Sequence, residues 1–152
     1  MATRARIGKR LTDGAVVSIY SHWDGYLEGV GDLLVNYYNT EEKVDELLNL
    51  GNISSLRERI KPNADEVHNF DFPLDDVTIA YGRDRGEKDT FARFSSSPHA
   101  YVMKLGEEYN YLFMDGDWYF AVCEENVNEM TDEYTMTIRW ELVRDWIGKG
   151  VY

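Results

Sequence analysis

The sequence predicts an α+β fold, with a mostly antiparallel or mixed sheet, a helix pair packed on one face and a C-terminal β-meander. Three observations support this prediction. Residues 15–20 form a continuously apolar, β-branched run, which is typical of a buried strand. Two stretches of helical periodicity follow between residues 27 and 51. The last third of the chain combines a Gly-containing turn with strict alternation of apolar and polar residues.

The N-terminal residues differ in character from the rest of the chain. Residues 1–13 are polar and basic with little periodicity, so we expect a basic N-terminal arm, either mobile or forming a short first strand. Residues 14–152 are expected to form a single acidic α+β domain, because a chain of 152 residues suits one domain. A chain of this length can bury a sizeable core.

Two helices are expected after the first buried strand. The first covers residues 27–38, where apolar side chains recur at helical spacing: Leu27, Val30, Leu34, Tyr37 and Tyr38. In the second, Asn39 and Glu42 match an Asn version of the capping box, and Gly51 stands where the helix should end. Its apolar side is formed by Val44, Leu47 and Leu48.

The middle of the chain predicts less regular structure. Residues 52–76 contain two prolines and many polar residues, and we expect a connecting region. Residues 77–81 form a second β-branched run and predict a strand that ends at Gly82. Residues 82–99 are charged and then Ser-rich, so we expect an exposed loop with Phe91 and Phe94 turned inward.

The C-terminal third predicts a meander. Apolar runs at residues 109–114 and 118–123 flank Asp115, Gly116 and Asp117, which predict a hairpin turn. Residues 134–142 alternate strictly between apolar and polar, as expected for a strand with one buried face. Trp146 and Ile147 are expected to pack a short tail back onto the body.

The charge is strongly negative and unevenly distributed. The first ten residues hold four of the 16 basic side chains and no acid, so residues 11–152 carry −16, from 12 basic and 28 acidic side chains. Twenty of these acids lie in three stretches without a Lys or Arg, at residues 11–42, 62–82 and 105–138. Such a field repels phosphate backbones and anionic membranes and attracts basic proteins. We therefore expect no direct nucleic-acid or membrane binding.

Cysteine content and hydropathy suggest a cytoplasmic protein. Cys123 is the single cysteine, so no intramolecular disulfide can form, and a reducing compartment fits best. No apolar stretch approaches the length of a membrane span, and the N-terminus lacks the apolar region of a secretory signal.

One candidate ligand site follows the first buried strand. Residues 22–31 lead from this strand toward a helix N-terminus, where backbone amides favour anions. The candidate residues in this loop are His22, Trp23, Asp24, Tyr26, Gly29 and Gly31. The alternative is structural: Asp24 caps the helix, the aromatic rings fill core, and the glycines allow close packing.

A second candidate segment, residues 82–87, follows the other β-branched strand. Arg83 and Arg85 in it can bind anions in a bidentate manner. If both strands end at the same edge of one sheet, these arginines face His22 and Asp24 and complete a pocket for a nucleotide or another small molecule. The alternative is a charged turn whose arginines pair with neighbouring acids.

Metal-dependent and nucleophilic chemistry find no support in the sequence. The three histidines and Cys123 are scattered and match no metal-binding spacing, so we expect neither a metal site nor a cofactor. The acids that follow Cys123 disfavour its thiolate, and no residue is assigned a catalytic role.

An acidic stretch near the C-terminus is the candidate partner-binding surface. It contains Glu124, Glu125, Glu129, Asp132 and Glu133. Such a stretch is typical of a solvated loop. A sharper interpretation is a carboxylate array that imitates a DNA backbone and occupies the basic cleft of a nucleic-acid-handling protein.

Several motifs together resemble a group of small, uncharacterised proteins of phages and bacteria. They are the strand followed by His-Trp-Asp-Gly-Tyr at residues 22–26, Gly-Val-Gly at residues 29–31, and Tyr-Gly-Arg-Asp-Arg-Gly-Glu at residues 81–87. The resemblance covers about residues 15–87 and implies a phage or mobile-element setting, in the cytoplasm of a host cell. Short acidic proteins in such settings often bind and block host enzymes or defence machinery.

Three functions are therefore expected in order of preference. The first is an acidic accessory protein that binds, and inhibits, a basic host protein involved in nucleic-acid handling or defence. The second is a small-molecule or nucleotide-binding domain, or an enzyme, with a pocket formed by residues 22–31 and 82–87. The third is an assembly role through exposed aromatic side chains, since the chain holds 11 Tyr, 6 Phe and 4 Trp. The oligomeric state is left open.

Overall fold

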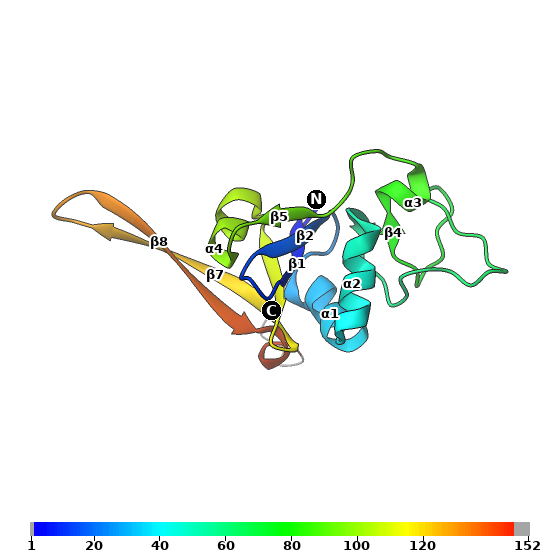
Figure 1. The fold of residues 1–152 in the computed structure, drawn as a ribbon, viewed down its shortest axis with the longest axis horizontal. Helices are drawn as coiled ribbons and strands as arrows, with labels where there is room; N and C mark the ends of the chain where they lie inside the picture. Colours follow the sequence, from blue (N-terminus) through cyan, green and yellow to red (C-terminus); the bar gives the residue numbers. More distant parts are fainter. Residues whose placement is uncertain (1, 148–152) are drawn as a thin grey trace.

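A computed structural model describes residues 2–147 and has the predicted α+β architecture (Figure 1). Its eight-stranded sheet has the order β4-β3-β2-β1-β6-β7-β8, with β5 paired to β2 beside this path. Neighbouring strands are antiparallel except in the β1–β6 and β2–β3 pairs. The strands are β1 (Ala5–Arg10), β2 (Val16–Ser21), β3 (Ile53–Ser55), β4 (Ile79–Ala80), β5 (Arg93–Ser95), β6 (Tyr109–Met114), β7 (Asp117–Asn128) and β8 (Glu133–Leu142).

The N-terminal residues form an inner strand of this sheet and not a separate arm. β1 lies between β2 and β6, and Ala5 and Ile7 are fully buried. The expectation of a basic arm at residues 1–13 is therefore corrected in favour of its alternative, a first strand. Two of its basic side chains pair with acids of the body: Lys9 Nζ lies 2.5 Å from Glu41 Oε2 and 2.8 Å from Asp45 Oδ1, and Arg10 pairs with Asp115.

Two helical segments follow β2, as the periodicity predicts. The first begins with a π-helical turn, η1 (Leu27–Gly31), and continues as α1 (Asp32–Tyr37). The second is α2 (Glu41–Leu50), which ends at Gly51 with φ +83°. Its N-cap is Thr40 and not Asn39, because the Thr40 hydroxyl accepts a hydrogen bond from the Lys43 amide.

The two faces of the sheet are covered by different helices. On one face, Ile7 and Ile19 join a core with Leu34 of α1 and with Val44 and Leu47 of α2. This places the helix pair on one face, as predicted. On the opposite face, a smaller core contains Val16, Leu112, Tyr101 and Val102, the last two from η2 (Tyr101–Leu105). The short helix α4 (Pro98–Ala100) leads directly into η2.

The middle of the chain contains more structure than the sequence predicts. The second β-branched run pairs as a strand only over β4, because Tyr81 begins the helix α3 (Tyr81–Arg85). The expected loop at residues 82–99 thus holds part of α3, β5 and the start of α4. Phe91 and Phe94 are about three-quarters exposed, so the prediction that they turn inward was wrong. Among the described strands, β5 pairs only with β2, at the margin of the sheet. At such a position, the apolar character of a phenyl ring is not enough to place it in the core.

The C-terminal meander β6-β7-β8 is confirmed. Asp115 and Gly116 have φ of +53° and +79°, as a tight hairpin turn of the I′ type requires. After β8, the turn η3 (Val143–Asp145) leads to Ile147, which packs on the main core, and Trp146 meets Phe120 edge-on.

β7 and β8 extend far beyond the rest of the sheet. β6 pairs with β7 only as far as Phe120, whereas β7 and β8 pair continuously from Tyr119 and Leu142 to Asn128 and Glu133. The result is a two-stranded ribbon that projects from the body at the left of Figure 1. We call its outer part, residues 124–137, the arm. The acidic stretch is therefore not an irregular loop, because its ends are paired strands and only residues 129–132 form the turn that joins them.

Candidate functional site

The loop at residues 22–31 is fixed to the sheet by backbone hydrogen bonds. The amides of His22 and Trp23 donate to the carbonyls of Ile53 and Ser54, over 3.2 and 3.0 Å. His22 Nδ1 lies 2.7 Å from the hydroxyl of Tyr20, and the Trp23 ring meets the imidazole edge-on at 4.7 Å. Trp23 itself is 41% exposed. These side chains pack on each other.

The glycines of this loop are explained by close packing. A Cβ on Gly25 would lie 2.8 Å from the Thr3 carbonyl oxygen, and one on Gly29 would lie 2.2 Å from that of Asp24. The Tyr111 hydroxyl donates a hydrogen bond to the Gly25 carbonyl over 2.6 Å, which links the loop to strand β6. Gly31 is buried, and a Cβ at this position would lie close to the side chain of Val143. The structural alternative for these glycines thus accounts for their positions.

Asp24 does not cap the following helix with its side chain. Its carboxylate accepts a hydrogen bond from the Tyr26 hydroxyl over 3.1 Å, and η1 has no side-chain cap. Its backbone adopts φ +56°, and its carbonyl accepts from the Val30 amide. The loop is closed by this backbone hydrogen bond.

The two arginines of residues 82–87 are engaged by neighbouring groups. Arg83 donates to the Asp84 carboxylate over 2.8 and 3.0 Å, and to the carbonyls of Ile60 and Thr78 over 2.5 and 2.6 Å. Arg85 lies over the rings of Phe70 and Tyr81, 4.4 and 4.8 Å from their centroids, and also pairs with Glu87. This arrangement matches the charged-turn alternative.

The two candidate loops leave the sheet in opposite directions. β2 is parallel to β3, and β3 is antiparallel to β4, so the chain runs oppositely in β2 and β4. The partners of Arg83 and Arg85 named above come from residues 60–87 and not from the loop at residues 22–31. The last residues of the two strands, Ser21 and Ala80, both pair with Ile53 of β3, so the strands end side by side but the chain leaves them in opposite directions. The contacts of the two arginines thus give no support to a shared pocket.

A buried His–Asp pair is the feature that sequence reasoning missed. The side chains of His68 and Asp84 are almost completely buried, and His68 Nε2 lies 3.2 Å from Asp84 Oδ2. The Leu74 amide donates to His68 Nδ1, so the imidazole carries its proton on Nε2 and donates it to Asp84. Since both ring nitrogens are engaged, this pair is structural. His68 and Asp84 are 16 residues apart in the sequence, across a segment with little regular secondary structure, so no sequence pattern predicts their contact.

The environment of Asp84 favours its charged form. Burial disfavours the carboxylate, but hydrogen bonds from Arg83 and from the Ala80 amide outweigh this effect and hold the pKa of Asp84 below its usual range. Asp84 thereby connects α3 with β4 and with the irregular segment around His68.

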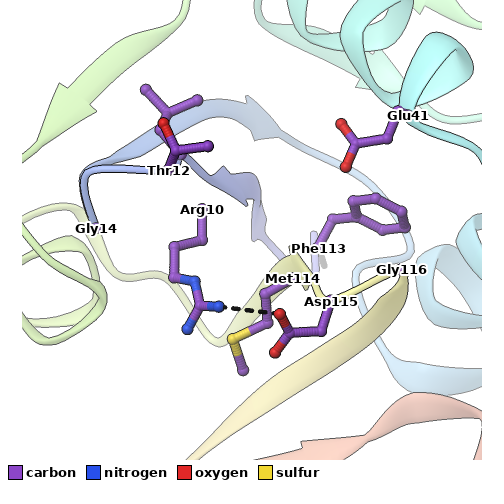
Figure 2. Close-up of a pocket in the computed structure, with 9 residues that line it drawn as sticks. Arg10, Thr12, Gly14, Glu41, Phe113, Met114, Asp115 and Gly116 are labelled. Carbon is purple, nitrogen blue, oxygen red and sulfur yellow. Dashed lines mark hydrogen bonds and ion pairs between the residues drawn. The ribbon is translucent and has the colours of Figure 1, made fainter.

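The depressions of ligand size on the surface include two that contain neither Arg83 nor Arg85. One, of about 380 Å³, lies beside the β6–β7 turn, and Figure 2 shows Arg10 and Asp115 pointing toward each other in it, at 3.2 Å. The other, of about 420 Å³, lies where the ribbon joins the body, between Leu27, Phe120 and Trp146. Its charged side chains include Arg139, which already pairs with Glu124 and Glu141. Neither depression combines the residues of the two candidate loops.

The arm brings the predicted acidic residues together. Within it every residue is exposed except Met136, which is half-buried. The arm carries five acids and no basic residue, and these acids are Glu124, Glu125, Glu129, Asp132 and Glu133. Glu124 pairs with Arg139 at the base of the arm. The other four have no ion-pair partner among the described residues.

The ribbon has one apolar and one polar face. Cross-strand partners share a face, so the apolar face comprises the pairs Ala121–Trp140, Cys123–Ile138, Glu125–Met136 and Val127–Tyr134. At its base this face packs on the smaller core, where the Trp140 ring lies parallel to that of Tyr101 at 6.5 Å. Toward the tip it is uncovered: Val127 is 51% and Tyr134 is 74% exposed.

The polar face carries hydroxyls, amides and carboxylates. Its outer pairs are Glu124–Thr137, Asn126–Thr135 and Asn128–Glu133. Asn126 donates from its side chain to Thr137 over 3.2 Å, which links the two strands. The arm thus presents carboxylates beside an apolar stripe, the composition of a surface that binds another protein.

The described part of the chain shows no metal-binding cluster and no membrane-spanning helix. Among residues 2–147, no group of His, Cys, Asp and Glu side chains is arranged to hold a metal ion. Within the same residues, no helix has both the length and the apolar character needed to cross a membrane.

Comparison of the chain with protein-family models, with curated proteins and with solved structures found no match.

Proposed function

We propose that this chain is an acidic accessory protein that binds a basic protein partner through its arm. The observation that carries the proposal is the geometry of residues 124–137, a projecting two-stranded ribbon with five acids, no basic residue and an uncovered apolar stripe. A two-stranded hairpin is only marginally stable in water when nothing packs on it. A partner protein that packs on the apolar stripe would bury its side chains and stabilise the arm.

Charge supports a basic partner. The whole chain carries −12, and seven of its 16 Lys and Arg side chains, among them Lys9, Arg59 and Arg139, form ion pairs with its own acids among the described residues. The field around the arm is therefore negative, and it would accelerate the approach of a basic surface and repel an acidic one.

The spacing of the charges argues for a protein interface more than for imitation of DNA by the arm alone. A strand rises about 3.4 Å per residue, so each strand of the arm spans roughly 20 Å. Five acids over that length give about one charge per 4 Å. Duplex DNA carries one charge per about 1.7 Å of its axis. The arm thus has less than half the linear charge density of DNA, and it adds apolar side chains that DNA lacks.

The setting of this role follows from the motif resemblance. We propose that the chain acts in a phage or mobile-element context, where it binds and blocks a basic host protein involved in nucleic-acid handling or defence. The resemblance of residues 15–87 to small phage and bacterial proteins supports this setting, and the arm supplies the binding element.

Affinity capture from a bacterial lysate tests the proposal. The full chain is compared with an arm variant, Glu129→Gln, Asp132→Asn and Glu133→Gln, and with a control, Glu42→Gln, Glu46→Gln and Glu58→Gln. Both variants change the net charge equally, and all six side chains are exposed. We expect a basic protein to be captured at low salt by the wild type and the control but not by the arm variant. Equal capture by all three chains would refute the role of the arm.

A further inference from the structure

Among residues 2–147, the outer edge of β8 has no strand partner. β8 is the last strand in the sheet order, and in the described part of the chain it pairs only with β7. Every second residue of β8, Glu133–Leu142, therefore presents its backbone N–H and C=O groups on the outer side without a strand partner among the described residues.

This edge lacks most of the features that protect natural edge strands. Proteins block such edges with prolines, bulges, inward-pointing charges or lysines. β8 contains no proline and no lysine, and its pairing with β7 runs without a register shift. Its one basic residue, Arg139, is held in ion pairs with Glu124 and Glu141. The edge is regular and long enough to receive another strand.

We infer that an extended segment of a basic partner adds to β8 as a further strand of the sheet. This inference rests on the proposed function and specifies its mode of binding. Added strands gain affinity from main-chain hydrogen bonds and specificity from their alternating side chains. Apolar side chains of the segment would lie beside Tyr134 and Met136, and basic side chains beside Glu133 and Glu141 on the other face of β8. The recognised segment therefore alternates basic and apolar residues.

A second copy of this chain fits the edge less well than a basic segment. It would bring a second arm with the same five carboxylates beside the first, within a dimer of two chains that each carry −12. Like charges placed opposite each other on neighbouring strands are destabilising. A lysine-containing segment would instead neutralise the arm.

Amide hydrogen exchange of the full chain tests this inference. The probe is a synthetic peptide as long as β8, with lysine and valine in alternation, added at low salt. We expect alternate amides within Glu133–Leu142 to exchange at least about tenfold more slowly when the peptide is bound, because only every second amide faces the outer edge. The amides of β7 should change little.

A matched control peptide separates strand addition from simple charge attraction. N-methyl groups on adjacent central amides keep every charge and side chain but block both edges of the peptide. We expect this peptide to bind at least about tenfold more weakly. Equal binding of both peptides without protection of β8 would overturn strand addition, while the lysate experiment would still decide the role of the arm. Absence of peptide binding would also overturn it, as would sedimentation of the free chain as a dimer with β8 already protected.

Discussion

Several polar side chains in this protein hold a segment without regular secondary structure in place. Residues 56–78 contain no helix or strand, and they are fixed by polar side chains such as Arg59, which binds Glu66 and Asp76. Asp84 is almost completely buried and accepts hydrogen bonds from Arg83, His68 and the Ala80 amide. Removing it would leave several donors without an acceptor.

Replacing Asp84 with alanine should lower the free energy of unfolding by about 2–4 kcal/mol, because a buried charged acceptor is lost while its donors remain. The matched control is Glu87→Ala, whose exposed pair with Arg85 should contribute no more than about 0.5 kcal/mol. Urea denaturation of both variants measures the difference. Similar small losses in the two proteins would show that Asp84 does not hold the segment.

The same residue predicts a dependence of stability on pH. The pKa of Asp84 is lower in the folded chain than its ordinary value. Its contribution should be complete above the unfolded pKa, about 3.9, and should be lost as the pH falls through the folded pKa. The stability difference between the wild type and Asp84→Asn should therefore shrink below about pH 4. A difference that stays constant into stronger acid would contradict this assignment.

The residue-level site could be predicted only in part from the sequence. Close packing explains the glycines of residues 22–31, and that alternative was visible in their spacing. The hydrogen-bond partners of Arg83 could not be predicted, because the carbonyl of Ile60 lies 23 residues away across a segment with little regular secondary structure. Long-range contacts of this kind leave no periodic pattern.

At the level of elements, the strands of the meander were predictable, but the extension of β7 into the arm and the exposure of Tyr134 were not. Turn chemistry at Asp115 and Gly116 and the alternation in β8 predicted the meander correctly. Residues 124–133 were interpreted as a loop because their exposed strand has little apolar alternation. Their structure comes from cross-strand pairing with β8, whose C-terminal part packs on the smaller core through Trp140.

The base of the ribbon should therefore control how firmly it is held. Trp140→Ala removes the ring that stacks on the buried Tyr101, and we expect a loss of about 2 kcal/mol in the free energy of unfolding. Tyr134→Ala, on the same face but 74% exposed, should change it by less than about 0.5 kcal/mol. Chemical denaturation distinguishes the two. Equal losses would place the anchor of the ribbon elsewhere.

For the whole molecule, composition predicted the sign of the charge but not its arrangement. The basic N-terminal residues are spread along β1, where Lys9 and Arg10 pair with acids of α2 and the β6–β7 turn. The acids of the arm remain largely without such partners among the described residues. The chain thus concentrates negative charge on its most projecting element.

Binding to a basic partner should accordingly weaken with salt. We expect the affinity of the captured partner to fall at least about tenfold between low salt and about 0.5 M salt, because screening acts strongly on exposed charges. Titration calorimetry at several ionic strengths measures this fall. An affinity independent of salt would show that charge does not direct the interaction.

The central claim is that the arm is the binding element and is dispensable for folding. Replacing residues 125–136 with Asn-Gly joins Glu124 and Thr137, which lie opposite each other, by a hairpin turn. The exposed residues removed should change the free energy of unfolding by less than about 1 kcal/mol. The decisive measurement is the affinity of this shortened chain for the partner captured by the full one. We predict at least about a hundredfold loss; affinity within about twofold of the full chain, in a folded protein, would contradict the account.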